Sequence, residues 1–393
     1  MAGQVVRGDK YFPREKDQNK LLRRLRDGSH LLVLAPRRVG KTSMLFYLQD
    51  NPPDGYVFLY NIVQSCATEH EYYKQIIDNL FHSEFTDQLS SLFKWGKDQI
   101  DKFRSSITGV SVGATGIKFD QQDRQLTHRD LSAALNALTL DKKLVLIIDE
   151  FPDVVEKIYD QQDHKSAESF LSGCRELWSE QRLNQHVQFV LTGSIGLDTL
   201  VSKMALSDLI NVLIPVSIAP LSQAQGREFI NTLNHREQEP IQIDATAQDY
   251  LLDKVGWLMP YYIEILWMQL VDVYFDEGLD SVSPANIDAA YNTLFSIQYQ
   301  SHFNHWAERL NRFADSEKAL ASDVLTAMCE HAQLPGSHLF NLSQASRYQQ
   351  INCQYVIDCL IHDGYIFINQ AQCYQFTSPM LKEWWGRYAT RRL

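Results

Sequence analysis

The segment LAPRRVGKTS, residues 34–43, follows an apolar run and precedes a helical pattern. A strand, a loop and a helix in this order present backbone N–H groups that can bind phosphate. The spacing A-x-x-x-x-G-K-T departs from the phosphate-loop pattern only at Ala35, which is tolerated if that residue keeps a negative φ. We therefore predict a nucleoside triphosphate site formed by Ala35, Pro36, Arg37, Arg38, Val39, Gly40, Lys41, Thr42 and Ser43.

Three residues of this segment have types suited to phosphate and metal. Gly40 lets the backbone approach a phosphate, Lys41 can reach the β and γ phosphates, and the Thr42 hydroxyl can ligate Mg²⁺. An ordinary basic turn is the alternative for this segment taken alone, because near-matches to the pattern occur by chance.

A second motif, KLVLIIDE, ends an apolar run in the carboxylates Asp149 and Glu150. Asp149 can hold the Mg²⁺ shell with Thr42, and Glu150 can polarise a water for attack on the γ-phosphate. An acidic helix cap is the alternative. We favour the metal and base roles, because two motifs in the right order are more specific than either alone.

A third segment, FVLTGS, ends a further apolar run in Thr192 and Ser194. A small polar side chain there can sense the γ-phosphate or orient the water, although turn formation explains Gly193 and Ser194 equally well. The predicted catalytic residues are Glu150, Lys41 and Thr192, and the predicted metal ligands are Thr42 and Asp149.

The elements that must position these residues are short apolar runs alternating with longer helical patterns. Near-continuous apolarity predicts strands buried on both faces of a parallel sheet, as in a doubly wound α/β domain. The predicted strands are His30–Pro36, Tyr56–Val63, Lys143–Asp149, Val187–Gly193 and Asn211–Ile218.

Three domains are expected along the chain. An α/β core occupies 1–221 and carries a helical and β-hairpin insertion near 80–125, with the hairpin at Ile107–Phe119. An α-helical lid follows at 222–312, with Asp244 as one N-cap and Ser283-Pro284 opening another helix. Helices and a final pair of strands in 313–393 predict a winged-helix domain.

Composition narrows the class of protein. The chain has 393 residues and a formal net charge of −11, which disfavours bulk attraction to nucleic acid. A basic stretch at Arg7–Arg26 is best explained as a solvated helix face. The six scattered cysteines lack metal-ligand spacing, and neither a signal peptide nor a membrane span is expected, so we predict a cytoplasmic protein.

Together these segments resemble the archaeal-type P-loop ATPases, relatives of AAA+ and STAND ATPases and of origin-recognition-like proteins. The resemblance rests on YFPREKDQNKLLRRL, LAPRRVGKTS, LVLIIDEFPDV, FVLTGSIG, PVSIAPLS, VGWLMPYYIEIL, HFNHWAERL and LIHDGYIFI with YQFTSPMLKEWW. It implies a P-loop NTPase core, a helical lid and a C-terminal winged helix that bind ATP and Mg²⁺ and hydrolyse ATP slowly. It also implies that Arg14 and Pro260 lie near the adenine.

Two departures from the resemblance concern arginines. The stretch Leu191–Pro215 contains Lys203 but no arginine finger, and Gly256–Pro260 lacks a second-sensor arginine. An arginine finger raises the rate of GTPases by about 10³–10⁵-fold. The absence of both arginines therefore favours a slow switch. Arg37 and Arg38 can partly compensate, but we expect them to face solvent or a partner.

Three functions remain open. The first is an ATP-dependent conformational switch for a protein partner, with oligomerisation allowed. The second is a nucleic-acid-associated ATPase of initiator-like or transposition-regulator-like type; the predicted recognition helix, Tyr348–His362, disfavours it because it has no Lys or Arg. The third is a nucleotide-binding module without hydrolysis, which Asp149 and Glu150 argue against.

Overall fold

The computed structural model describes residues 5–81, 110–113, 116–119, 125–138, 141–193, 196–348 and 351–387. They form two compact units. The first unit comprises Val6–Ala35 and Lys41–Ile218. The second unit comprises the segment Pro36–Gly40 and the chain from Ala219 onward, so the phosphate-loop segment groups with the C-terminal half.

The first unit is built on a five-stranded parallel sheet of order β2-β5-β6-β1-β7. Each strand matches a predicted apolar run to within about two residues, which confirms the α/β fold class. The bounds are β1 His30–Leu34, β2 Tyr56–Ile62, β5 Lys143–Asp149, β6 Val187–Thr192 and β7 Leu213–Ser217. Because β6 separates β1 from β5, its carboxyl end lies between the carboxyl ends of β1 and β5.

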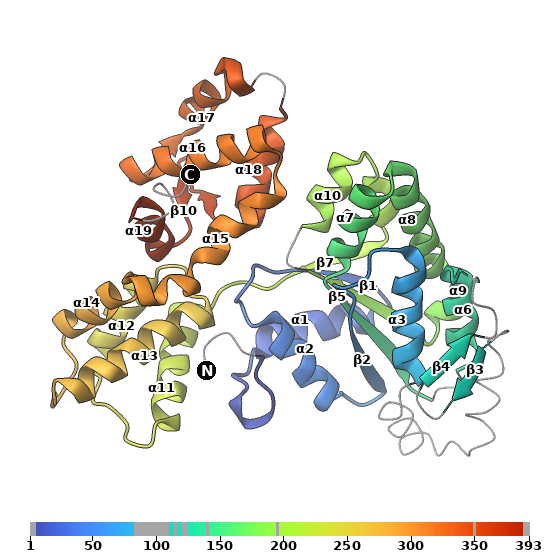
Figure 1. Cartoon of the computed structure of the whole chain (residues 1–393). Coiled ribbons are helices and arrows are strands. Elements are labelled where there is room, and N and C mark those ends of the chain that lie inside the picture. Colours follow the sequence, from blue (N-terminus) through green and yellow to red (C-terminus); the bar gives the residue numbers. More distant parts are fainter. Residues whose placement is uncertain are drawn as a thin grey trace. The chain divides into compact units, whose positions relative to one another are not determined.

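Helices cover both faces of this sheet (Figure 1). One face carries α1 (Glu15–Arg26) and α2 (Lys41–Asp50). The other packs against a large apolar core formed with α3 (Glu69–Phe81), α6 (His128–Asn136), α7 (Phe151–Gln161), α8 (His164–Ser179) and α10 (Leu197–Lys203). Alternate strand residues enter that core, so Asp149 points to the α2 face.

The predicted hairpin forms strands β3 (Val110–Gly113) and β4 (Gly116–Phe119), which pair antiparallel. The remainder of the insertion expected near 80–125 falls mostly outside the described residues. In α1 the leucines 21, 22 and 25 are buried, and the basic side chains lie mainly on the other side, as expected for a solvated face.

The lid portion of the second unit is helical, as predicted. The helices are α11 Gln223–Arg236, α12 Ala245–Val255, α13 Pro260–Asp276, α14 Pro284–Thr293 and α15 Asn304–Arg309. The Asp244 side chain accepts a hydrogen bond from Ala247 N at 2.8 Å, and Ser283 precedes Pro284 at the start of α14. Both predicted N-caps are therefore present.

The C-terminal portion has the element order of a winged helix. It contains α16 Asp315–Glu330, β8 Leu334–Pro335, α17 Gly336–Ser343, α18 Cys353–His362, β9 Ile366–Ile368, β10 Cys373–Phe376 and α19 Pro379–Arg387. The strands form a sheet of order β8-β10-β9. This portion groups with the lid in one unit, and buried Asp363 joins them by ion pairs to Arg309 at 3.0 Å and Arg312 at 2.6 Å.

Within the described ranges, no helix combines the length and apolarity needed to cross a membrane. All six cysteines are free thiols, and no cluster of three or more His, Cys, Asp or Glu side chains forms a metal site in the part of the chain that the structure describes.

Candidate functional site

The loop between β1 and α2 contains two residues with a left-handed backbone. Arg38 and Gly40 have positive φ values of 70° and 89°, whereas Ala35 is not among the positive-φ residues. The missing glycine therefore causes no backbone strain, as predicted. A Cβ placed on Gly40 would meet no atom within 4 Å, so the space beside this backbone is open.

The start of α2 brings two predicted site residues onto Asp149. The Lys41 ammonium donates to Asp149 Oδ1 at 2.9 Å, and Thr42 Oγ1 donates to Asp149 Oδ2 at 3.4 Å. The side chains of Lys41 and Asp149 are only 10% and 6% exposed, so this is a buried ion pair. Residues 107 positions apart thus converge as the two motifs predict.

Tyr60, on β2, is a member of this group that no motif indicated. Its hydroxyl donates to Asp149 Oδ2. Burial first, and then the negative charge of Asp149, raise the pKa of the Tyr60 phenol, which keeps the hydroxyl protonated. The sequence signal was limited to a tyrosine near the end of a predicted strand. The pairing of β2 with β5, which carries Asp149, comes from the structure.

Glu150 lies at the N-terminus of α7 with φ 61° and ψ 35°, in the left-handed region. This conformation costs a non-glycine residue about 1–2 kcal/mol and is often found at functional sites. Its backbone N–H donates to Asp149 Oδ1 at 3.1 Å. A Cβ on Gly193 would lie 2.5 Å from Pro152 Cδ and 3.6 Å from Glu150 Oε2, so the end of β6 approaches α7 closely.

Thr192 occupies the end of β6 beside both motifs. Its Cα pairs in register with Val33 of β1 and with Asp149 of β5. The residue is fully buried, and among the described residues its hydroxyl oxygen has no hydrogen-bond partner. A buried hydroxyl without a partner lowers the stability of the fold. Its presence at this position is consistent with a contact to a bound ligand. Ser194 lies outside the described residues.

These residues fit Mg²⁺ and a nucleoside triphosphate. Mg²⁺ prefers oxygen ligands from one or two side chains plus phosphates and waters. Thr42 Oγ1 and Asp149 Oδ2 are such a pair, 3.4 Å apart, and the open backbone at Gly40 leaves room for a phosphate. Lys41 supplies the charge that a phosphate needs.

The other predicted binding residues do not contact Asp149 in the hydrogen bonds described above. Ser43 Oγ accepts from Val6 N at 3.2 Å, so a structural contact already engages its hydroxyl. Arg14 is buried at 3% exposure and forms an ion pair with Asp17 at 2.8 Å. Pro260 is the first residue of α13, and Pro36 and Val39 lie in the loop with Val39 fully buried.

The two loop arginines differ from each other. Arg37 is exposed, as expected. Arg38 instead places its guanidinium 4.2 Å from the ring centroid of Tyr261 in α13, within the second unit. Arg38 is half-buried and has a left-handed backbone, so the ring contact is an addition to the expectation that Arg38 faces solvent or a partner, which stays a prediction.

No protein-family model matches the chain, and no curated protein matches it. Solved structures do. The Walker-type ATPase PABY2304 of Pyrococcus abyssi superposes with a TM-score of 0.65 at 16% identity, covering 96% of this chain and 97% of that chain. The ORC2 protein of Aeropyrum pernix, solved as ADPNP–ADP complexes, gives 0.52 at 12% identity, covering 98% and 96%.

The chain has an ORC-like P-loop ATPase fold. The match spans core, lid and C-terminal region, so the predicted resemblance is confirmed for the fold. In this ORC-like fold β1, β6 and β5 are adjacent, and they carry the loop, Thr192 and Asp149 respectively.

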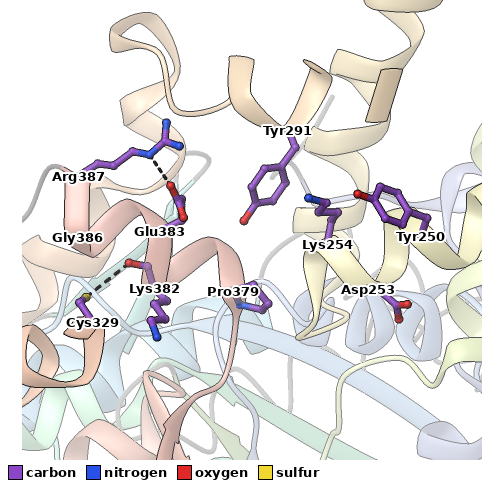
Figure 2. A pocket seen from close by; sticks show the side chains of 10 residues that line it. All are labelled: Tyr250, Asp253, Lys254, Tyr291, Cys329, Pro379, Lys382, Glu383, Gly386 and Arg387. Atoms are coloured by element: carbon purple, nitrogen blue, oxygen red, sulfur yellow. Dashed lines mark hydrogen bonds and ion pairs between the residues drawn. The ribbon is translucent and has the colours of Figure 1, made fainter. Parts of the chain in front are cut away.

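A separate cavity of about 630 Å³ lies in the second unit of the ORC-like fold (Figure 2). Residues of α12, α14, α16 and α19 line it. Its basic side chains already have partners: Lys254 with Asp288 at 2.6 Å, Arg387 with Glu383 at 2.6 Å, and Lys382 with the His331 carbonyl at 2.8 Å. The cavity therefore lacks the phosphate-binding features of the loop.

The predicted recognition helix begins later than expected, at Cys353, because the Asn352 side chain caps it by accepting from Tyr355 N at 3.1 Å. Gln354 Nε2 donates to Asp358 Oδ1 at 2.7 Å. The side-chain amides of Asn352 and Gln354 are thus engaged within the helix, and Gln349 and Gln350 lie outside the described residues.

Proposed function

We propose that the protein binds Mg·ATP at the phosphate loop, hydrolyses it slowly and acts as a conformational switch for a protein partner. The observation that carries the proposal is the convergence of Lys41 and Thr42 on buried Asp149. The open backbone at Gly40 beside this group supports it.

Each predicted residue has a role in this proposal. Lys41 leaves Asp149 to bind the β and γ phosphates, and Thr42 and Asp149 hold the metal. Bound Mg²⁺ neutralises charge on the phosphates. Glu150 accepts a proton from the attacking water, and the Thr192 hydroxyl positions that water or the γ-phosphate. The loop residues Ala35–Ser43 cradle the phosphates, while Arg14 and Pro260 are proposed to lie near the adenine.

The proposed slow rate rests on the arginine content around the site. Leu191–Pro215 and Gly256–Pro260 contain no arginine, and Arg38 is engaged by Tyr261. An arginine finger stabilises charge in the transition state and raises the rate of GTPases by about 10³–10⁵-fold. Turnover at this site lacks that contribution.

The domain division proposed for this switch is a core at 1–221, a lid at 222–312 and a winged helix at 313–393. The paired side chains of α18 and the net charge of −11 support a protein partner over nucleic acid. Several basic side chains of the N-terminal stretch are also paired, namely Arg7 with Asp50, Arg14 with Asp17, Arg24 with Asp27 and Lys20 with the Ser217 carbonyl.

The test compares two substitutions. Lys41→Met removes the phosphate-binding charge and is expected to abolish binding of a fluorescent ATP analogue. Glu150→Gln keeps binding and lowers single-turnover hydrolysis by about 10²–10⁴-fold. The exposed residues Lys165 and Glu168 of α8 provide matched controls as Lys165→Met and Glu168→Gln. Equal hydrolysis by Glu150→Gln and wild type would contradict the assigned base.

A further inference from the structure

Tyr60 is held by three separate contacts around the proposed metal site. Its backbone N–H donates to Gln49 Oε1 of α2 at 2.8 Å. Its ring packs on Phe46 of the same helix, with centroids 4.2 Å apart. Its hydroxyl donates to Asp149 Oδ2. The backbone, ring and hydroxyl are therefore each fixed, and the side chain has little freedom to leave the carboxylate.

The two oxygens of Asp149 have different sets of donors. Oδ1 accepts from Lys41 Nζ at 2.9 Å and from Glu150 N at 3.1 Å. Oδ2 accepts from Thr42 Oγ1 at 3.4 Å and from Tyr60. When Lys41 and Thr42 turn to phosphate and metal, Glu150 N and the Tyr60 hydroxyl remain as the donors that fix the plane of the carboxylate.

The Tyr60 hydroxyl is suited to this task because it is an uncharged donor and its ring is fixed on Phe46. A carboxylate that binds a metal is commonly oriented by such an outer hydrogen bond, and loss of the bond typically costs about 10–100-fold in metal affinity.

We propose that Tyr60 is a positioning residue for the metal: its hydroxyl holds Asp149 in the orientation that binds Mg²⁺ beside Thr42. The proposal rests on the proposed function, because it concerns the metal of the same site. It adds a residue that no motif identifies, contributed by the edge strand β2.

The variant that tests it is Tyr60→Phe, which removes the hydroxyl and keeps the ring on Phe46. Tyr56→Phe is the matched control, since Tyr56 lies at the opposite end of β2. Each full-length protein is first checked by thermal unfolding. Binding of a fluorescent ADP analogue in EDTA then reports the metal-free nucleotide site, and Mn²⁺ electron paramagnetic resonance of the nucleotide complex reports metal affinity.

The expected result is metal affinity reduced about 10–100-fold in Tyr60→Phe, with metal-free ADP binding equal to that of wild type and Tyr56→Phe. Unchanged metal affinity overturns the proposal. Tighter metal binding also overturns it, because it would show that the hydroxyl competes with the metal. An equal loss of metal-free ADP binding, or failure of Tyr60→Phe to fold, indicates a purely structural role. Absence of nucleotide binding in wild type contradicts the proposed function instead.

Discussion

Arg38 of the phosphate-loop segment and Tyr261 of lid helix α13 form a cation–π contact of 4.2 Å. The Tyr261 hydroxyl is in turn hydrogen-bonded to His302 Nδ1 at 2.7 Å. The lid lacks an arginine in Gly256–Pro260. Here the arginine comes from the loop and the lid supplies the aromatic ring, so the loop and α13 are in direct contact.

Tyr261→Leu should loosen the loop. Losing a cation–π contact worth about 0.5–2 kcal/mol is expected to speed amide hydrogen exchange in residues 37–40 by about 2–30-fold. Tyr261→Phe keeps the ring and removes only the bond to His302, so it serves as the control. Equal exchange in Tyr261→Leu, Tyr261→Phe and wild type would show that the contact does not hold the loop.

Thr192→Val should separate stability from activity. Valine has nearly the same shape and removes a buried hydroxyl without a partner among the described residues, a defect that costs about 1–3 kcal/mol. The free energy of unfolding, measured with urea, is therefore expected to stay equal or rise while single-turnover ATP hydrolysis falls. Loss of stability with unchanged hydrolysis would argue against the sensing role.

Gly193→Ala should destabilise the first unit. The new Cβ would lie 2.5 Å from Pro152 Cδ, and such overpacking costs about 1–3 kcal/mol. Gly336→Ala is the control, because its Cβ would meet only Tyr374 Cε2 at 3.8 Å. Urea unfolding curves of both variants measure the difference, and a Gly193→Ala curve that matches wild type would refute the close approach.

His305 should make stability depend on pH. Burial first, and then the charges of Arg38, Arg309 and Arg37, lower the pKa of His305 to about 3. The unfolded value is about 6.5, so the unfolded chain binds the proton more readily. The contribution of neutral His305 to the free energy of unfolding is complete above about pH 6.5. It is lost as the pH falls towards 3, by at most about 1.4 kcal/mol per pH unit.

Urea unfolding at neutral and mildly acidic pH checks this pH dependence. His305→Gln is expected to flatten the decline, whereas His235→Gln, an exposed site in α11, should leave it unchanged. A wild-type decline that persists in His305→Gln would assign the effect to other groups, such as Asp363. Burial raises the pKa of Asp363, but Arg309, Arg312 and His362 together hold it below its usual value.

Much of this architecture is predictable because its signals are local. Continuous apolarity marks β1, β2, β5, β6 and β7, and motif spacing indicates that Lys41 and Thr42 meet Asp149. The Gly40 backbone follows from the same motif.

The unpredicted contacts depend on tertiary packing between distant segments. Tyr60 reaches Asp149 only because β2 and β5 are neighbours in a definite register. Arg38 finds Tyr261 because the loop segment packs with the lid. No pattern within either segment encodes such a meeting, and the same holds for Gly193 beside Pro152.

The outer strands of the central sheet bear on self-association. At β2, the amide of Tyr60 is occupied by the Gln49 side chain. At β7, exposed Pro215 has no amide hydrogen to offer. Each border thus carries a block against an added strand. These two positions disfavour edge-to-edge aggregation through the sheet.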